Sequence, residues 1–318
     1  MLQALRLATV ETHRPPTIKS NKRHRIRVVK NKPMIIRGTS MISLKALAFA
    51  IAVTFIGTAA SAQSVECGSD TLCRVKAAGI LKIGTKDDYV PWSYRASDGT
   101  FKGMEVDIGK KIAEALGVKA EFVKVTSANR FEFLAQGQID LMIASASDTA
   151  ERRKIVAFVH PNYYSSGYTV LLPKAVKATE WAQIAGQTLC SVQGAWYNKP
   201  AQEKFGVNVL AFAGTAETEA AMTQGRCIGL LEDDNMINVR LSSEKWADYQ
   251  MPLPIQADTP WGMAVRQTDQ FAPFGYFVAG MITEMHRNGE LLEMEKANGI
   301  KNSAFLIKMH DALKDHIN

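Results

Sequence analysis

Residues 125–152 read VTSANRFEFLAQGQIDLMIASASDTAER. The stretch contains a short amphipathic segment, an apolar run, and a polar segment that begins with SDTAER. Glycine commonly follows the last turn of a helix, and Ser, Thr, Asp and Asn commonly precede the first. The pattern therefore predicts a helix that begins at Ser127 or Asn129 and ends before Gly137, then a buried strand, then a second helix.

Each of the two predicted helices carries an arginine in its first turn. Arg130 begins the first, and Arg152 lies in the second, which Asp148 or the threonine after it would cap. A helix N-terminus offers free N–H groups and partial positive charge, and arginine pairs well with carboxylates. With the hydroxyls of Ser145 and Ser147, this region is typical of a carboxylate site. The alternative is that Arg152 pairs with a surface glutamate and the serines only cap the helix.

Residues 41–62, MISLKALAFAIAVTFIGTAASA, have the pattern of a secretory signal peptide. A basic start precedes an apolar run from Ala46 to Ala60, which is shorter than the ~20 residues of a spanning helix. The sequence Ala-Ser-Ala before Gln63 is a typical cleavage site. We therefore expect a periplasmic protein whose mature form starts at or near Gln63. Residues 1–40 form a basic extension, which reflects either a start codon placed too early or a long leader.

The net positive charge of the chain resides in its first 62 residues. The whole chain has 38 basic and 31 acidic residues, and residues 1–62 contain 11 of the basic and one of the acidic ones. The remaining 256 residues therefore carry 27 basic and 30 acidic side chains, a net charge of −3. This balance argues against a nucleic-acid partner. The length is sufficient for one large domain or two smaller ones.

All four cysteines lie in the predicted exported part, where disulfides persist. Cys67 and Cys73 flank a polar, turn-like segment, so we expect them to form a small disulfide loop. Cys190 and Cys227 lie on two predicted neighbouring strands and form either a second bridge or two buried thiols. The cysteine spacing and the scattered histidines match no zinc pattern, so no metal site is expected.

The exported part alternates predicted strands and helices in two successive runs. The first comprises strand 81–85, helix 103–117, strand 120–125, the helix described above and strand 139–145. The second follows residues 168–172 and comprises strand 187–192, helix 196–205, strand 207–212, helix 215–225 and strand 227–233. An extended segment, 259–266, and helices at about 271–288 and 290–297 complete the chain. Two such runs predict an α/β fold in which each half is a doubly wound, mainly parallel sheet.

In open α/β sheets the ligand binds beyond the carboxyl ends of the strands. Applied to both halves, this rule gathers two sets of side chains on facing lobes. The first half contributes Lys86, Asp87, Ser145, Ser147 and Arg152, and the second contributes Gly194, Ala195, Trp196, Thr215 and Asp233. We therefore expect a ligand-binding cleft between two lobes.

Four stretches, in this order, resemble the periplasmic solute-binding proteins of family 3, the polar amino-acid class that serves ABC importers. They are LKIGTKDDYVPWSY (81–94), GMEVDIGKKIAEALG (103–117), TSANRFEFLAQGQIDLMIASASDTAERRKIVAF (126–158) and GRCIGLLEDD (225–234). The resemblance covers nearly all of residues 75–300 and is closest to the glutamate/aspartate-type members. The second stretch has Met104 and Glu105 where the family usually has an aromatic residue and Asp.

The resemblance implies a two-lobed periplasmic-binding-protein fold whose lobes are joined by two hinge crossovers, near 164–167 and 260–262. Lobe 1 would comprise residues 63–166 and 262–318, and lobe 2 would comprise 167–261. The implied mechanism is hinge closure over a ligand bound mainly to lobe 1. An ABC permease in the inner membrane would recognise the closed monomer, and no cofactor is implied.

The same resemblance implies roles for individual residues. Arg152, helped by Ser145 and Ser147, would bind the α-carboxylate of an amino acid. Asp233 would accept the α-ammonium group. These assignments agree with the carboxylate site expected from the residues themselves.

Lys86 lies at the side-chain end of the implied site. The resemblance implies that binders of basic amino acids have Asp at this position and that glutamate/aspartate binders have Arg. A lysine there would repel arginine or ornithine. Arg130 matches the arginine that reaches a side-chain carboxylate in the acidic-amino-acid members. The implied ligand is therefore an acidic or neutral polar amino acid. The alternative for Lys86 is an orientation toward solvent.

Aromatic and hydroxyl groups complete the implied site. Tyr89 and Trp92 belong to the aromatic loop that commonly walls the ligand in this family. Thr215 stands where the acidic-amino-acid members have His, and Trp196 stands where a small or hydroxylic residue is usual. The alternative for Trp196 is simple packing in the core of lobe 2.

Two further functions remain open at this point. Periplasmic cyclohexadienyl dehydratases look similar to this family and need a general acid or base, for which Asp87, Asp88, Glu232 or Asp233 is available. The sequence contains no G-x-S-x-G, H-E-x-x-H or P-loop motif, so we expect a binding protein without catalytic residues. A sensory protein that presents its closed form to a chemoreceptor or kinase would use the same binding module.

Overall fold

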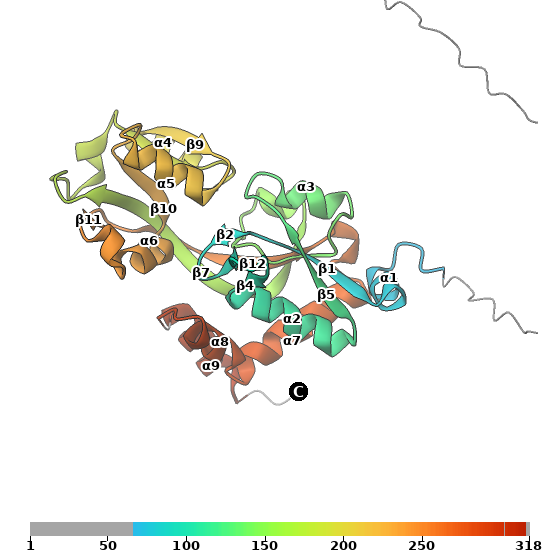
Figure 1. Ribbon diagram of the computed structural model, residues 1–318. Helices are drawn as coiled ribbons and strands as arrows, with labels where there is room; N and C mark the ends of the chain where they lie inside the picture. The colour runs from blue at the N-terminus through green and yellow to red at the C-terminus, as the bar shows by residue number, and fades with distance from the viewer. Residues whose placement is uncertain (1–65, 302, 316–318) are drawn as a thin grey trace, which may run out of the picture. The chain divides into compact units, whose positions relative to one another are not determined.

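The computed structural model describes residues 66–301 and 303–315, and the predicted basic extension and signal peptide lie outside these ranges. The described residues form an α/β protein with two lobes (Figure 1). None of the helices in these ranges is long and apolar enough to span a membrane. The predicted fold class is confirmed.

Lobe 1 contains a parallel sheet covered by helices. Strand β1 (Ile80–Thr85) lies between β5 (Lys119–Lys124) and β6 (Leu141–Met142), and both pairings are parallel. Helix α2 (Met104–Leu116) buries an apolar face that includes Met104, Ile108, Ile112 and Leu116. Gly103 precedes this helix at φ 117°, and a Cβ there would lie 2.4 Å from the Trp92 carbonyl oxygen, so the turn requires glycine.

Lobe 2 repeats the architecture with a second group of parallel strands. Strand β8 (Thr188–Val192) lies between β9 (Asn208–Phe212) and β10 (Gly229–Asp233). The helices of this lobe are α4 (Asn198–Phe205), α5 (Thr215–Thr223) and α6 (Asp234–Leu241). The strands and helices predicted in the two alternating runs are therefore present with shifts of a few residues at their ends, although strand 139–145 is reduced to β6. Helix α6 follows Asp233 directly and was not predicted.

Two long antiparallel strands join the lobes. β7 (Ala157–Pro173) pairs with β12 (Gln256–Val265), and the whole sheet has the order β5-β1-β6-β12-β7-β10-β8-β9. The sequence indicated only residues 168–172 and 259–266 as extended. β7 is buried without interruption from Tyr163 to Leu172, so it lacks the alternation of polar and apolar residues that reveals a strand. The predicted lobe boundaries and hinge positions fall on these strands and stay predictions.

The remaining elements are short or terminal. They are α1 (Thr71–Ala78), β2 (Asp88–Tyr89), β3 (Ser93–Arg95), β4 (Phe101–Lys102), α3 (Arg130–Ala135), β11 (Tyr249–Gln250), α7 (Pro273–Arg287), α8 (Glu290–Ala297), α9 (Ala304–Leu313) and the 3-10 turns η1 (Arg152–Lys154), η2 (Trp181–Ile184), η3 (Glu244–Trp246) and η4 (Gln267–Asp269). Helices α1 and α9 were not predicted from the sequence. Helix α3 agrees with the first helix of the opening stretch.

The second helix predicted in the opening stretch is wrong. Only η1 forms there, and Asp148 does not cap it. The Asp148 N–H donates to the Pro260 carbonyl oxygen (2.8 Å), and its carboxylate accepts from Arg153 (2.6 and 2.8 Å). Because these bonds tie Asp148 to β12, the chain turns only briefly before it enters β7. Because only this short turn forms, the expected carboxylate site depends on the Arg152 side chain and not on a helix N-terminus.

Both cysteine pairs form disulfides. Cys67 is bonded to Cys73, as predicted, and Cys190 is bonded to Cys227. The second bridge links β8 to the segment before β10 in the core of lobe 2. The sequence left open whether these two cysteines form a bridge or remain thiols, and the structure shows the bridge.

Replacing Cys190 and Cys227 together with alanine is expected to lower the free energy of unfolding by about 3–4 kcal/mol, because the bridge restricts a long loop of the unfolded chain. The matched control replaces Cys67 and Cys73, which are 6 residues apart instead of 37. This shorter loop predicts a loss of only about 2 kcal/mol. Urea unfolding of the two double variants measures the difference. Equal losses would contradict the loop-length explanation.

Candidate functional site

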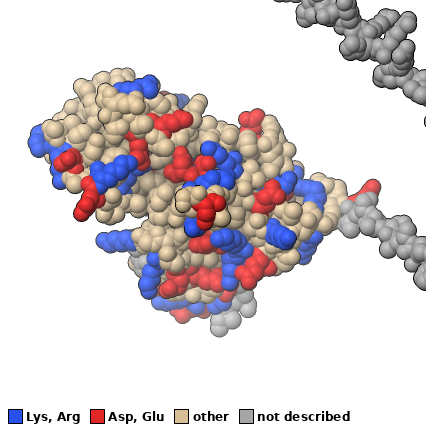
Figure 2. All heavy atoms as spheres, viewed as in Figure 1, with Lys and Arg blue, Asp and Glu red and all other residues tan. Residues whose placement is uncertain are grey.

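Polar side chains from both lobes converge on a small pocket, which we call the inner pocket. Its volume is about 10 Å³, which is about the space that one water molecule needs. Its lining comprises Lys86, Tyr89, Ser127, Arg130, Ser145, Ser147, Arg152, Val192, Ala195, Trp196, Tyr197 and Asp233. Eight of the ten residues predicted to bind a ligand are therefore brought together here. On the face drawn in Figure 2, acidic and basic side chains gather where the two lobes meet.

Arg152 reaches from lobe 1 to lobe 2. Its guanidinium donates to the Ser147 carbonyl oxygen (2.9 Å) and to the Gly194 carbonyl oxygen (2.9 Å). Burial, with the charge of Arg130 as a second cause, lowers the pKa of Arg152 to about 9. It therefore remains a cation at neutral pH. Among the described residues no glutamate pairs with this guanidinium, so the alternative of a surface ion pair does not apply to the residues in view.

Arg130 is the second buried cation and the first residue of α3. Its Nη1 donates to the carbonyl oxygens of Ala144 and Ser145, and its Nε has no hydrogen-bond partner within the described residues. Its guanidinium lies 5.1 Å from the Phe131 ring centroid, and that of Arg152 lies 5.2 Å from the same ring. The ring is close enough to attract both cations. A buried donor without an acceptor is costly, so this edge of the pocket favours an anionic occupant.

Lys86 and Asp233 form the opposite side of the pocket with Tyr89 between them. The Tyr89 hydroxyl donates to Asp233 Oδ2 (2.5 Å), and Lys86 Nζ lies 3.8 Å from the Tyr89 ring centroid. Burial raises the pKa of Asp233 to about 7 and lowers the pKa of Lys86 to about 8. Lys86 is only 7% exposed, so its side chain points into the cleft and not to solvent.

Glu105 holds residues of the site in place through hydrogen bonds, a role that was not predicted from the sequence. Its carboxylate accepts from the N–H and hydroxyl of Ser145 (both 2.7 Å), from Tyr163 (2.6 Å) and from Ser93 (2.9 Å). These bonds hold Ser145 at φ 47°, a conformation rare for non-glycine residues. The available signal was position, because Glu105 lies on the same helix face as Ile108 and is fully buried.

Trp92 and Thr215 differ from their predicted roles. Trp92 is fully buried and lines no pocket at this cleft. It packs behind Tyr89, with ring centroids 5.7 Å apart, because the loop turns its side chain into the core. Thr215 lies beyond the inner pocket, where its backbone N–H donates to Asp88 Oδ2 (2.6 Å). Trp196 fulfils both alternatives, since it lines the inner pocket and packs edge-on against Tyr168 at 5.4 Å.

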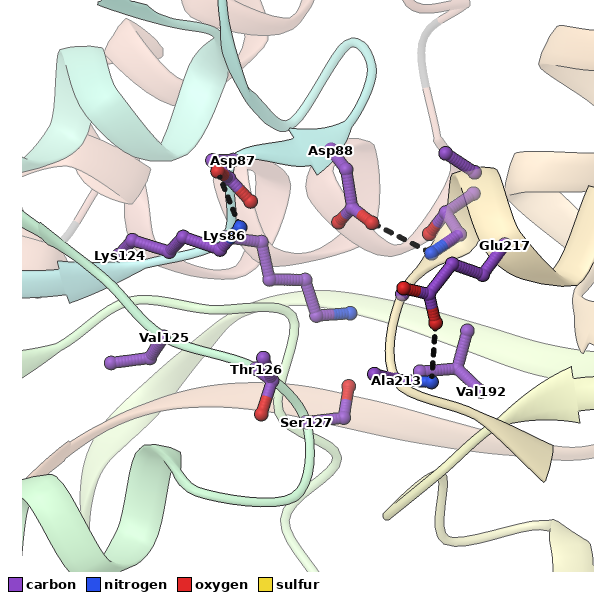
Figure 3. A pocket seen from close by; sticks show the side chains of 13 residues that line it. Lys86, Asp87, Asp88, Lys124, Val125, Thr126, Ser127, Val192, Ala213 and Glu217 are labelled. Atoms are coloured by element: carbon purple, nitrogen blue, oxygen red, sulfur yellow. Dashed lines mark hydrogen bonds and ion pairs between the residues drawn. The ribbon is translucent and has the colours of Figure 1, made fainter.

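A second cavity, which we call the outer compartment, adjoins the inner pocket. Its volume is about 260 Å³. Its lining comprises Lys86, Asp87, Asp88, Lys124, Val125, Thr126, Ser127, Val192, Ala213, Gly214, Thr215, Ala216 and Glu217 (Figure 3). Lys86, Ser127 and Val192 line both spaces, so the two meet at these residues.

The lobes contact each other directly around the two spaces. The contacts are Tyr89 to Asp233, Arg152 to the Gly194 carbonyl, and Asp88 to the Thr215 N–H. Gly194 has φ 82°, and a Cβ on it would lie 2.6 Å from the Ser127 carbonyl oxygen. Glycine is therefore required for this close approach of the lobes. The geometry is that of a closed cleft.

Comparisons with known proteins agree with this geometry. The family model described as bacterial extracellular solute-binding proteins, family 3, matches residues 81–312. The ABC transporter glutamine-binding protein of Bacillus subtilis is 30% identical over 210 residues, which are 64% of this chain and 76% of that protein. Cyclohexadienyl dehydratase of Pseudomonas aeruginosa is 27% identical over 216 residues, 68% of this chain and 73% of that protein.

A solved structure shows the same fold. The solute receptor for L-cysteine of Neisseria gonorrhoeae is 27% identical, with a TM-score of 0.67 over 71% of this chain and 92% of that chain. The two-lobed α/β fold of this chain agrees with the family-model match. The chain belongs to the bacterial extracellular solute-binding proteins of family 3. The family predicted from the four sequence stretches is confirmed.

Proposed function

We propose that this chain is the periplasmic substrate-binding component of an ABC importer for a polar amino acid, and that the amino acid is acidic. The observation that carries the proposal is the charge of the inner pocket. Three cations, Lys86, Arg130 and Arg152, face one carboxylate, Asp233. An α-amino acid would use Arg152 for its carboxylate and Asp233 for its ammonium group. Two cations then remain, and an anionic side chain neutralises them best.

The nearby carboxylates are already engaged. Glu105 accepts bonds from hydroxyl and amide groups, and Glu232 is paired with Arg240 (2.9 Å). The charge of Glu105 still acts on Lys86 and Arg130, but its oxygens are occupied by these hydrogen bonds and are not available to pair directly with either cation. Trp196 Nε1 and Arg130 Nε, both buried and without partners among the described residues, add two donors. A ligand rich in acceptor oxygens would satisfy them.

The relatives support this class of ligand and the transport role. The proteins similar to this chain include a glutamine-binding ABC transporter component and an L-glutamate/L-aspartate-binding protein of Pseudomonas aeruginosa, 24% identical. The three contacts between the lobes support hinge closure as the mechanism. In this proposal an inner-membrane permease recognises the closed form. A cationic ligand is disfavoured because Lys86 would repel it.

A dehydratase is the second candidate, because Asp233 combines a pKa of about 7 with a buried position, and one relative is such an enzyme. Incubation with prephenate, which would lose water and carbon dioxide to give an aromatic product, tests this role by ultraviolet absorbance. We expect no product above the buffer control, since all four inner charges are accounted for by amino-acid binding. Turnover that Asp233→Asn abolishes would replace the binding proposal with an enzyme.

Replacing Arg152 with alanine is expected to weaken every accepted amino acid by about 2–5 kcal/mol, or roughly 30- to several-thousand-fold, since the α-carboxylate loses its buried partner. Arg153→Ala is the matched control, because the Arg153 side chain is exposed and bonds to Asp148, whereas its backbone carbonyl oxygen accepts from the Gln267 side chain. Calorimetry with glutamate, glutamine and arginine measures both. Equal affinity of Arg152→Ala and the unchanged protein would contradict the proposed site.

The affinity for glutamate is expected to be highest between about pH 7 and pH 8. Below pH 7 the ligand ammonium must displace a proton from Asp233, whose pKa is about 7, so affinity falls as pH falls. Above pH 8 Lys86, whose pKa is about 8, loses the charge that attracts the side-chain carboxylate.

Calorimetry from about pH 5 to about pH 10 measures both the acidic and the alkaline decline in affinity. Lys86→Met is expected to remove the decline that begins near pH 8 and to leave the one near pH 9, where Arg152 loses its charge. Asp233→Asn is expected to remove the acidic decline. A profile that is flat in the unchanged protein would contradict these assignments.

A further inference from the structure

We propose that Asp88 of lobe 1 is a positioning residue for ligand binding. Its carboxylate caps the N-terminus of helix α5 in lobe 2 when the cleft closes, and this contact raises the affinity for every accepted ligand by the same factor. The inference rests on the proposed function, because it takes hinge closure over an amino acid as the event that brings Asp88 to the helix. It adds a residue that sets affinity without contacting the ligand.

Helix α5 begins without a cap from its own N-cap residue. That residue is Gly214, which has no side chain to accept a bond. At the starts of α1 and α9, by contrast, the side chains of Asp70 and Ser303 accept from N–H groups of the first turn. Such acceptors satisfy donors that have no partner inside a helix. The start of α5 is therefore open to an acceptor from elsewhere in the chain.

Asp88 supplies this acceptor from the opposite lobe. The N–H of Thr215, the first residue of α5, donates to Asp88 Oδ2 at 2.6 Å across 127 positions of sequence (Figure 3). The negative charge of the carboxylate also interacts favourably with the partial positive charge of the helix N-terminus. Thr215 is buried and Asp88 is half-buried, so water and salt screen the contact less than they screen one on the open surface.

The glycine at position 214 leaves room for the Asp88 carboxylate. Its φ of −139° and ψ of 172° are available to any residue, so backbone conformation does not require glycine here. A Cβ at this position would, however, lie 2.6 Å from Asp88 Oδ2, which is closer than a side-chain carbon approaches an oxygen. A local cap at position 214 and the Asp88 cap therefore exclude each other.

The contact acts on closure and not on ligand recognition. Asp88 lines the outer compartment, and the described lining of the inner pocket does not include it. A ligand held by Arg152 and Asp233 is therefore out of its reach. Opening of the hinge would separate Asp88 from α5 and leave the Thr215 N–H to water. The bond thus stabilises the closed form relative to the open one, and such a contribution changes all ligand affinities by one factor.

Two substitutions of Asp88 separate capping from charge. Asp88→Ala removes the acceptor and is expected to weaken glutamate and glutamine alike by about 2- to 30-fold, the range for loss of a helix cap. Asp88→Asn is the matched control, because it removes the same charge but keeps an oxygen that caps helices well, so it should retain most of the affinity. Calorimetry measures both variants. Unchanged affinity in Asp88→Ala, or tighter binding of glutamate alone in both variants, would overturn the inference and leave the proposed function intact.

A substitution in lobe 2 tests the same contact from its other side. Gly214→Ser gives α5 a local cap and displaces Asp88, so the free energy of unfolding without ligand should not fall, whereas the affinity for both amino acids should fall as in Asp88→Ala. Adding Asp88→Ala to Gly214→Ser should cause little further loss, because the contact is already absent. Urea unfolding and calorimetry measure the three variants.

Losses of affinity that multiply in the double variant would overturn the inference, since the two residues would then act independently. A parallel fall of stability and affinity in Gly214→Ser would also overturn it, because that result describes a structural role. Binding of neither glutamate nor glutamine by the unchanged protein would contradict the proposed function and overturn the inference with it.

Discussion

The antiparallel pairing of β7 with β12 determines how the cleft is built. Trp261 pairs with Tyr164 and Pro260 with Ser165, so these two strands, which cross between the lobes, support each other. This pairing places the carboxyl end of β10 on one side of the cleft and the Ser145–Arg152 segment on the other. It also anchors that segment, because the Asp148 N–H bonds to Pro260. The position of Arg152 thus depends on a strand that lies more than a hundred residues further along the chain.

An aromatic cluster beneath the cleft explains why its charges behave unusually. Tyr89, Trp92, Tyr164 and Trp261 pack with ring centroids 5.3–6.2 Å apart and exclude water from one side of the site. Desolvation is the largest cause of the raised pKa of Asp233 and of the lowered pKa of Lys86. The pKa values of both groups therefore lie within about a unit of physiological pH. A zwitterionic ligand would restore full charge to both, since it supplies the counter-charges that the dry pocket lacks.

The sequence predicted the architecture well where local chemistry determines it. Helix α2, with its apolar face from Met104 to Leu116, and the strand that ends at Asp233 both follow from periodicity and position. The features that it failed to predict depend on distant contacts. Trp92 turns into the core because Trp261 and Tyr164 are there, and the segment after Asp148 is not helical because β12 holds it. Which neighbour Glu105 would bond could not be inferred, since Tyr163 is 58 residues away.

The unpaired groups of the site have one feature in common, which is that they are donors. Asp87, Asp88, Glu105 and Glu217 all have protein partners, whereas the Arg130 Nε, the Trp196 Nε1 and the Lys86 ammonium lack acceptors among the described residues. Buried donors without acceptors raise the free energy of the closed form when no ligand is bound. An anionic amino acid removes that cost, and the same groups that recognise it would thereby favour the closed form that a permease binds.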